Sequence, residues 1–181
     1  MTYFTSDQHF GHGNIIKYCS RPFKTVEEMD EVMLAKWNSR VTDEDDVWIL
    51  GDLFFRSAAV VPVLEQLKGR KHLILGNHDP SWCGKIELEK HFASVGEIYN
   101  GTIDGHRVTM CHYPMLTWDG DKNSYMIYGH IHNHTTADYW PLIAKRVHML
   151  NAGVEVNGYM PVTFGELIAN NRTFRGDYVS R

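Results

Sequence analysis

Residues 47–52 read VWILGD, four apolar residues followed at once by a glycine and an aspartate. A short run this rich in β-branched and aromatic side chains is typical of a buried strand. The polar residues directly after the run mark where that strand ends. Five other apolar runs predict short strands in the same way: residues 3–5, 72–75, 108–111, 126–128 and 147–150.

Helices are expected between and after these strands. Residues 25–40 begin with Thr25, which forms a T-x-x-E capping box with Glu28, and continue with apolar residues at helical spacing. Pro161 suits an early position in a helix near the end of the chain. Three further helices are predicted in this way: residues 58–67, 85–92 and 161–170.

The order of the expected elements indicates the fold class. Strands alternate with helices in the first half of the chain, and Asp104-Gly105 predicts a hairpin turn between later strands. We therefore expect an α/β fold, a layered sandwich of mixed β-sheets flanked by helices. Because the chain has 181 residues and no Pro-, Gly- or Ser-rich linker, one domain over residues 1–181 is expected.

The composition excludes several classes of protein. With 43% hydrophobic and 22% charged residues, the chain is unlike a disordered or coiled-coil protein. Its net charge of −4 lacks the basic excess of a typical nucleic-acid-binding protein, so nucleic acid is possible as a partner but unsupported. No signal peptide and no long apolar stretch are seen, so no membrane partner is expected. Three widely spaced cysteines fit a reducing, cytoplasmic location.

Histidine is frequent, with 11 residues in the chain, and it is the commonest metal ligand in proteins. Side chains that can bind a metal follow five of the expected strands. In open α/β sheets, the carboxyl ends of the strands border a crevice where residues distant in sequence meet. The seven candidate ligands are Asp7, His9, Asp52, Asn77, His112, His130 and His132.

The chemistry of this set suggests which metals it would bind. Imidazole and carboxylate ligands without a thiolate suit Mn, Fe, Zn or Ni better than Ca or Mg. Seven protein ligands are too many for one transition metal, but they suffice for two ions that share one carboxylate. Two such ions can clamp the oxygens of an in-line displacement at phosphorus. We expect two divalent metal ions, with Mn as the first choice.

Five motifs occur in a fixed order: D-x-H at residues 7–9, G-D at 51–52, G-N-H-D at 76–79, H at 112 and G-H-x-H at 129–132. This series resembles the calcineurin-like metallophosphoesterase family. The tail, NAGVEVNGYMPVTFGEL, is similar to the closing segment of small, cap-less bacterial and phage members. The resemblance implies hydrolysis of a phosphomonoester or phosphodiester by in-line attack of a hydroxide that bridges two metals.

The family pattern divides the candidate ligands between the two metals. It implies that Asp52 bridges both ions. The first ion would be bound by Asp7, His9 and His132. The second ion would be bound by Asn77, His112 and His130.

The same pattern implies roles in catalysis and in substrate binding. His78 would donate a proton to the leaving oxygen, and Asp79 would orient the His78 imidazole. Arg56 lies four residues after Asp52, a spacing similar to that of a phosphate-binding arginine in the protein-phosphatase branch. The expected substrate-binding residues are Asn77, Arg56 and His12.

Two other interpretations compete with a phosphoesterase. A catalytically silent binding or regulatory module on the same fold would be expected to lack ligands or the proton donor, and every such position is filled here. A metallo-β-lactamase fold is excluded, because its H-x-H-x-D-H motif falls early in the chain, whereas residues 130–134 read HIHNH. We expect a small phosphate ester or nucleotide-type substrate, bound in an open site built from loops such as residues 10–24, 80–84 and 113–124. The sequence does not set the oligomeric state.

Overall fold

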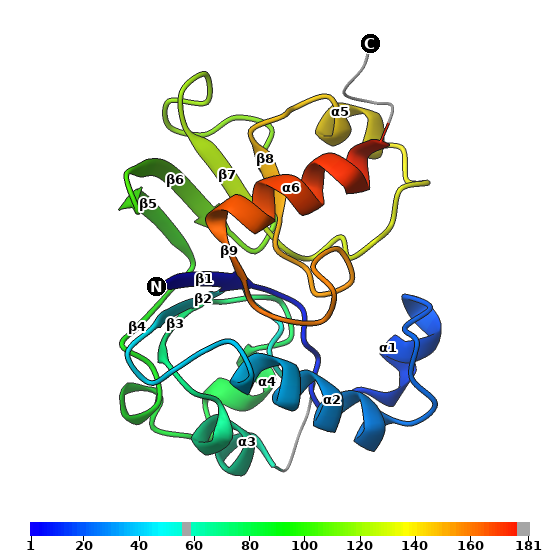
Figure 1. Ribbon diagram of the computed structural model, residues 1–181, viewed down its shortest axis with the longest axis vertical. Coiled ribbons are helices and arrows are strands. Elements are labelled where there is room, and N and C mark those ends of the chain that lie inside the picture. Colours follow the sequence, from blue (N-terminus) through cyan, green and yellow to red (C-terminus); the bar gives the residue numbers. More distant parts are fainter. Residues whose placement is uncertain (56–58, 177–181) are drawn as a thin grey trace.

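Two β-sheets lie against each other in the computed structural model, which describes residues 1–55 and 59–176 (Figure 1). The first sheet has the strand order β4-β3-β2-β1-β9. Its first four strands in sequence run parallel, and β9 pairs antiparallel with β1. The strands are β1 (Thr2–Thr5), β2 (Asp46–Ile49), β3 (Arg70–Ile74), β4 (Ser94–Gly96) and β9 (Val162–Thr163).

The second sheet has the order β5-β6-β7-β8 and also mixes strand directions. β5 and β6 form an antiparallel hairpin, and β6, β7 and β8 run parallel. Asp104 and Gly105 join the hairpin with positive φ at both positions, which confirms the predicted turn. The strands are β5 (Ile98–Ile103), β6 (His106–Cys111), β7 (Tyr125–Tyr128) and β8 (Met149–Asn151).

Most helices cover the outer faces of the two sheets, and the last one packs along the apolar cluster between them. Half of the predicted capping box of the longest helix is present, because the Thr25 hydroxyl accepts a hydrogen bond from the backbone N–H of Glu28 at 3.2 Å. The Glu28 carboxylate accepts from the backbone N–H of Lys24 instead of Thr25. None of the helices in the described ranges is long and apolar enough to cross a membrane. They are α1 (Gly13–Tyr18), α2 (Val26–Asn38), α3 (Val60–Gln66), α4 (Pro80–Cys83), the 3₁₀ turn η1 (Leu88–Lys90), α5 (Trp140–Ala144) and α6 (Phe164–Arg175).

Side chains along the central strands point alternately into two apolar clusters, which form the layers of the fold. Val47 and Ile49 of β2 lie in one apolar cluster with side chains of α2 and α3. Trp48, between them, lies in a second cluster with Ile127 of β7 and Leu150 of β8. Successive side chains of a strand point to opposite faces, so each sheet has a helix-facing and a sheet-facing side. The chain therefore forms the predicted α/β sandwich, with mixed sheets flanked by helices.

Two helix predictions were wrong in detail. Residues 85–92 were expected to be helical, but only the 3₁₀ turn η1 forms there. The apolar anchors of this segment are Ile86, Leu88 and Phe92, and their spacing of two and four residues does not build a helical stripe. The last helix begins at Phe164 instead of residue 161, because Thr163 and Glu166 form the capping box there.

Candidate metal centre

Polar residues gather at the carboxyl ends of parallel strands from both sheets. Asp7 follows β1, Asp52 follows β2, and Asn77 follows β3. His112 comes directly after β6, and His130 lies two residues after β7. These ends meet because the first sheet packs face to face on the second, so residues more than one hundred positions apart line one site.

Asp52 lies at the centre of the group. Its Oδ2 atom is 3.6 Å from Nε2 of His9, 3.5 Å from Nε2 of His112 and 3.9 Å from Nε2 of His78. Burial of Asp52 opposes its ionisation, but the hydrogen bonding of the carboxylate to His112 outweighs this and lowers the pKa to about 2. Asp52 is therefore a buried carboxylate that faces one histidine from each predicted ligand set.

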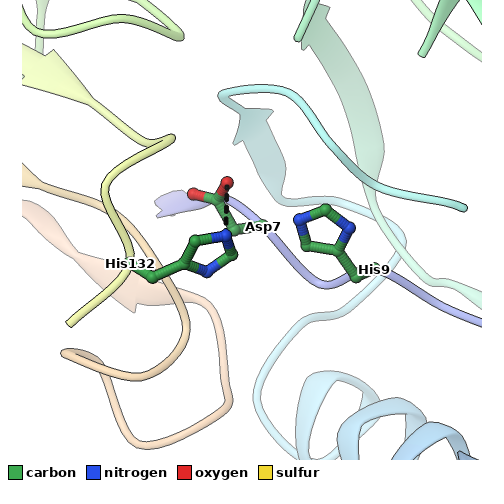
Figure 2. Close-up of side chains that lie close together, drawn as sticks. All are labelled: Asp7, His9 and His132. Carbon is green, nitrogen blue, oxygen red and sulfur yellow. Dashed lines mark ion pairs between the residues drawn. The ribbon is translucent and has the colours of Figure 1, made fainter. Parts of the chain in front are cut away.

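The predicted ligands of the first metal form a buried cluster, shown in Figure 2. Nε2 of His132 lies 4.0 Å from Oδ1 of Asp7, and the rings of His9 and His132 stack with centroids 5.2 Å apart. Nε2 of His9 is buried and has no hydrogen-bond partner in the described part of the chain. Burial lowers the pKa of His9 to about 2, so its imidazole is neutral and has a free lone pair for a metal.

The predicted ligands of the second metal also lie together. Oδ1 of Asn77 is 3.2 Å from Nε2 of His112, and the rings of His112 and His130 are 5.1 Å apart. Nδ1 of His112 lies 2.7 Å from the carbonyl oxygen of Leu50, which can accept its N–H and so leave Nε2 facing the centre. His112 is buried, whereas Asn77 and His130 are exposed, so this half of the site borders solvent.

The backbone of the site is strained. Eight non-glycine residues in the described ranges have positive φ, a region that costs most side chains about 1 kcal/mol or more. Five of the eight are predicted metal ligands, so the strain is concentrated at the centre. These five residues are Asp7, His9, Asp52, His130 and His132.

Glycines let the chain approach this centre closely. A Cβ atom built on Gly76 would collide with the carboxylate of Asp52, and one on Gly129 would collide with Ser6 and Asp7. Any other residue at these two positions would therefore displace a predicted ligand or its loop.

The charges of the site fit bound cations. Four buried carboxylates lie in or directly beside the centre, Asp7, Asp52, Asp79 and Glu155, and one buried guanidinium, Arg21, accompanies them. Burial raises the pKa of Asp7 and of Asp79, so their charged forms need positive charge nearby. Two divalent ions would supply that charge, and the mixed donor set of imidazole, amide and carboxylate suits them.

Glu155 and Arg21 support the candidate site, and the sequence pattern did not reveal them. Oε1 of Glu155 lies 3.0 Å from Nδ1 of His132 and accepts hydrogen bonds from Arg21 at 2.7 and 2.9 Å. Arg21 also donates to the carbonyl oxygens of Asp7 and Gln8, both at 2.7 Å. The pair therefore ties the His132 ring to the loop that presents Asp7. Neither residue follows a strand directly, so nothing in its position marked it as part of the site.

We expect the substitution Glu155→Gln to weaken metal binding about 10- to 100-fold, because the carboxylate that orients the His132 ring through Nδ1 is lost. The measurement is a manganese titration of the purified protein followed by calorimetry. Glu87→Gln is the matched control, since Glu87 is exposed and pairs with Lys90. Unchanged manganese affinity in the Glu155 variant would show that His132 needs no such partner.

Asp79 is buried at the site, and backbone groups of two loops donate to it. Its carboxylate accepts hydrogen bonds from the backbone N–H groups of Gly76, Asp52 and Leu53 and from the indole of Trp82. The His78 ring is not among its hydrogen-bond partners in the described residues. Four N–H donors occupy its carboxylate, and a role of Asp79 in orienting His78 stays a prediction. Asp79 thus joins the loop after β2 to the loop after β3.

The structure describes only one of the other predicted substrate-binding residues, His12. His12 is buried against Phe55, with ring centroids 3.7 Å apart, and its Nδ1 lies 3.4 Å from Nδ1 of His9. Burial lowers the pKa of His12 to about 4, so the ring is a neutral neighbour of the centre. Arg56 lies outside the described residues. Residues 80–84, expected as a loop, contain the short helix α4.

Comparison with known proteins agrees with the family resemblance of the sequence motifs. The family model of the calcineurin-like phosphoesterase superfamily domain matches residues 4–161. The uncharacterised protein MJ1445 of Methanocaldococcus jannaschii is 35% identical over 92% of this chain and 88% of its own length, and the gene 66 protein of Mycobacterium phage L5 is 29% identical over 87% of each. The crystal structure of the protein of unknown function AQ665 from Aquifex aeolicus superimposes with a TM-score of 0.69, at 27% identity over 90% of this chain and 94% of that one.

Proposed function

The chain belongs to the calcineurin-like phosphoesterase superfamily, and from this premise we propose that it hydrolyses a phosphomonoester or a phosphodiester with the help of two divalent metal ions. The observation that carries the proposal is the position of Asp52, whose Oδ2 atom faces His9 from one predicted ligand set and His112 from the other. A carboxylate that faces one histidine from each of two ligand sets suits a pair of ions that share it.

The chain's own residues would hold the two ions. Asp52 would contact both. Bound there, the ions would polarise the phosphoryl oxygens and lower the pKa of water. One ion would lie among Asp7, His9 and His132, and the other among Asn77, His112 and His130.

His78 has the access that a proton donor needs. Its side chain is 35% exposed, and its Nε2 atom is 3.9 Å from Oδ2 of Asp52. The backbone N–H of His78 donates to Oδ1 of Asp52 at 2.8 Å, and its ring meets Phe55 edge to face at 5.0 Å. His78 is thus held beside the centre without being buried in it. We assign it the transfer of a proton to the leaving oxygen.

The rim of the site suits a small substrate. Asn77 and His130 are exposed, so a phosphate ester can reach the centre from solvent. A small phosphate ester or a nucleotide-type ester is the substrate we propose. The free cysteines Cys19, Cys83 and Cys111 fit a reducing compartment, and we propose that the protein acts in the cytoplasm.

Removal of metal is expected to abolish hydrolysis. We predict that protein treated with EDTA cleaves neither p-nitrophenyl phosphate nor bis-p-nitrophenyl phosphate, and that Mn²⁺ restores the activity at about two ions per chain. Ca²⁺ and Mg²⁺ serve as controls and should restore less, because imidazole ligands disfavour them. Absence of activity on both esters with Mn²⁺, Fe²⁺, Zn²⁺ and Ni²⁺ would refute the proposed function.

A further inference from the structure

We propose that Tyr113 is a stacking platform that selects esters with a planar aromatic group, a proposal that rests on the phosphoesterase function above. Tyr113 directly follows His112 at the end of β6 and begins the loop of residues 113–124. It is 46% exposed, although it lies beside a buried predicted ligand. A large ring left half open at the rim of the site is available to a substrate.

Two predicted ligands hold the Tyr113 ring in place. Its centroid lies 4.7 Å from that of His130 and 5.2 Å from that of His112, with interplanar angles of 65° and 73°. Both contacts are edge to face, an arrangement that aromatic pairs prefer. Pro114 also restricts the backbone of Tyr113 to extended conformations. The ring is therefore ordered before a ligand arrives, and a ligand would lose little affinity by ordering it.

The location of Tyr113 determines which part of an ester it would meet. A phosphoryl group bound beside His112 and His130 lies at the centre, and its organic substituent must extend past the exposed rim toward solvent. Tyr113 contacts both of these histidines and is itself half exposed, so its ring is within reach of such a substituent. Leu116, in the same loop, is 52% exposed. A flat aromatic substituent can stack there, whereas a methyl group is too small to cover the ring.

Binding of non-hydrolysable phosphonates tests this platform separately from catalysis. Calorimetry on the manganese-loaded protein would compare methylphosphonate, phenylphosphonate and the 5′-methylenephosphonate analogue of AMP. We expect phenylphosphonate to bind about tenfold more tightly than methylphosphonate, because stacking on an aromatic side chain stabilises a bound ring by about this factor or more. Tyr113→Ala should reduce this preference to less than about twofold, whereas Tyr113→Phe should retain it. Tyr139→Ala, which removes another exposed tyrosine, is the matched control.

Each outcome separates the platform from the proposed function. A preference for phenylphosphonate that survives in Tyr113→Ala overturns the platform. Equal binding of both phosphonates by the wild-type protein also overturns it, even if p-nitrophenyl esters are hydrolysed and the phosphoesterase proposal stands. A Tyr113-dependent preference without hydrolysis of any ester supports the platform and refutes the phosphoesterase. Tight binding of the AMP analogue assigns the platform to nucleosides, and binding of phenylphosphonate alone assigns it to small aryl groups.

Discussion

Replacing Asp52 by asparagine is expected to lower kcat for p-nitrophenyl phosphate by at least about 10²- to 10³-fold. The substitution removes the charge that faces His9 and His112, and with it the shared ligand of the two predicted metals. The amide oxygen can still accept the hydrogen bond from the backbone N–H of His78, so the loop after β3 keeps its anchor. Steady-state kinetics in Mn²⁺ and metal analysis of the same samples would measure both effects.

The control for this variant is Asp119→Asn. The side chain of Asp119 is 73% exposed and pairs with Arg107 on the surface, so neither rate nor metal content should change. We expect the Asp52 variant to hold fewer than two manganese ions per chain. Two tightly bound ions and a normal rate in Asp52→Asn would contradict the central position that we give to this carboxylate.

His78→Ala is expected to lower kcat about 10²- to 10⁴-fold while leaving the manganese content unchanged. His78 belongs to neither predicted ligand set, and its ring borders the centre with one-third of its side chain exposed. A proton donor matters most when the leaving group is a strong base. The loss should therefore be larger for an alkyl phosphate than for p-nitrophenyl phosphate, whose leaving group departs without protonation.

His134→Ala is the matched control, because His134 is an exposed histidine in the loop that follows the predicted ligands His130 and His132. It should keep both activity and metal. Equal losses of rate and of manganese in His78→Ala would assign His78 to the metal instead of the proton. An equal rate loss for alkyl and nitrophenyl esters would also contradict its role as an acid.

The strands were the part of the fold that could be predicted well. In the run VWIL, every side chain is buried, so the unbroken apolar sequence by itself predicts a strand. The short helix α1 was missed, because six residues carry too few apolar positions to show a helical period. β4 was missed for a related reason. It has three residues, one of them Gly96, and only its parallel pairing with β3 defines it as a strand.

Local sequence revealed the candidate ligands but not the groups that support them. Asp7, Asp52 and His112 lie within three residues of a strand end, so their order along the chain indicates where they lie in the fold. Glu155 acts through a hydrogen bond to His132, and Arg21 through a bond to Glu155, so their roles depend on loops that meet only in the folded protein. The hydrogen bonds of Asp79 could not be predicted from the sequence either. Its place beside His78 suggested one contact, whereas three backbone N–H groups and the Trp82 indole donate to its carboxylate.

The pairing of Arg21 with Glu155 has a consequence for how the protein is made. It joins positions 134 residues apart, and ribosomes synthesise chains from the N-terminus at about 5 to 20 residues per second. While the later part of the chain is still inside the ribosome, Asp7 and His9 lack both His132 and the carboxylate that orients it. Contacts this distant in sequence can form only after the entropy of closing a long loop has been lost, which slows folding. If the chain binds metal as proposed, the first metal would be loaded only after residues 132 and 155 have left the ribosome.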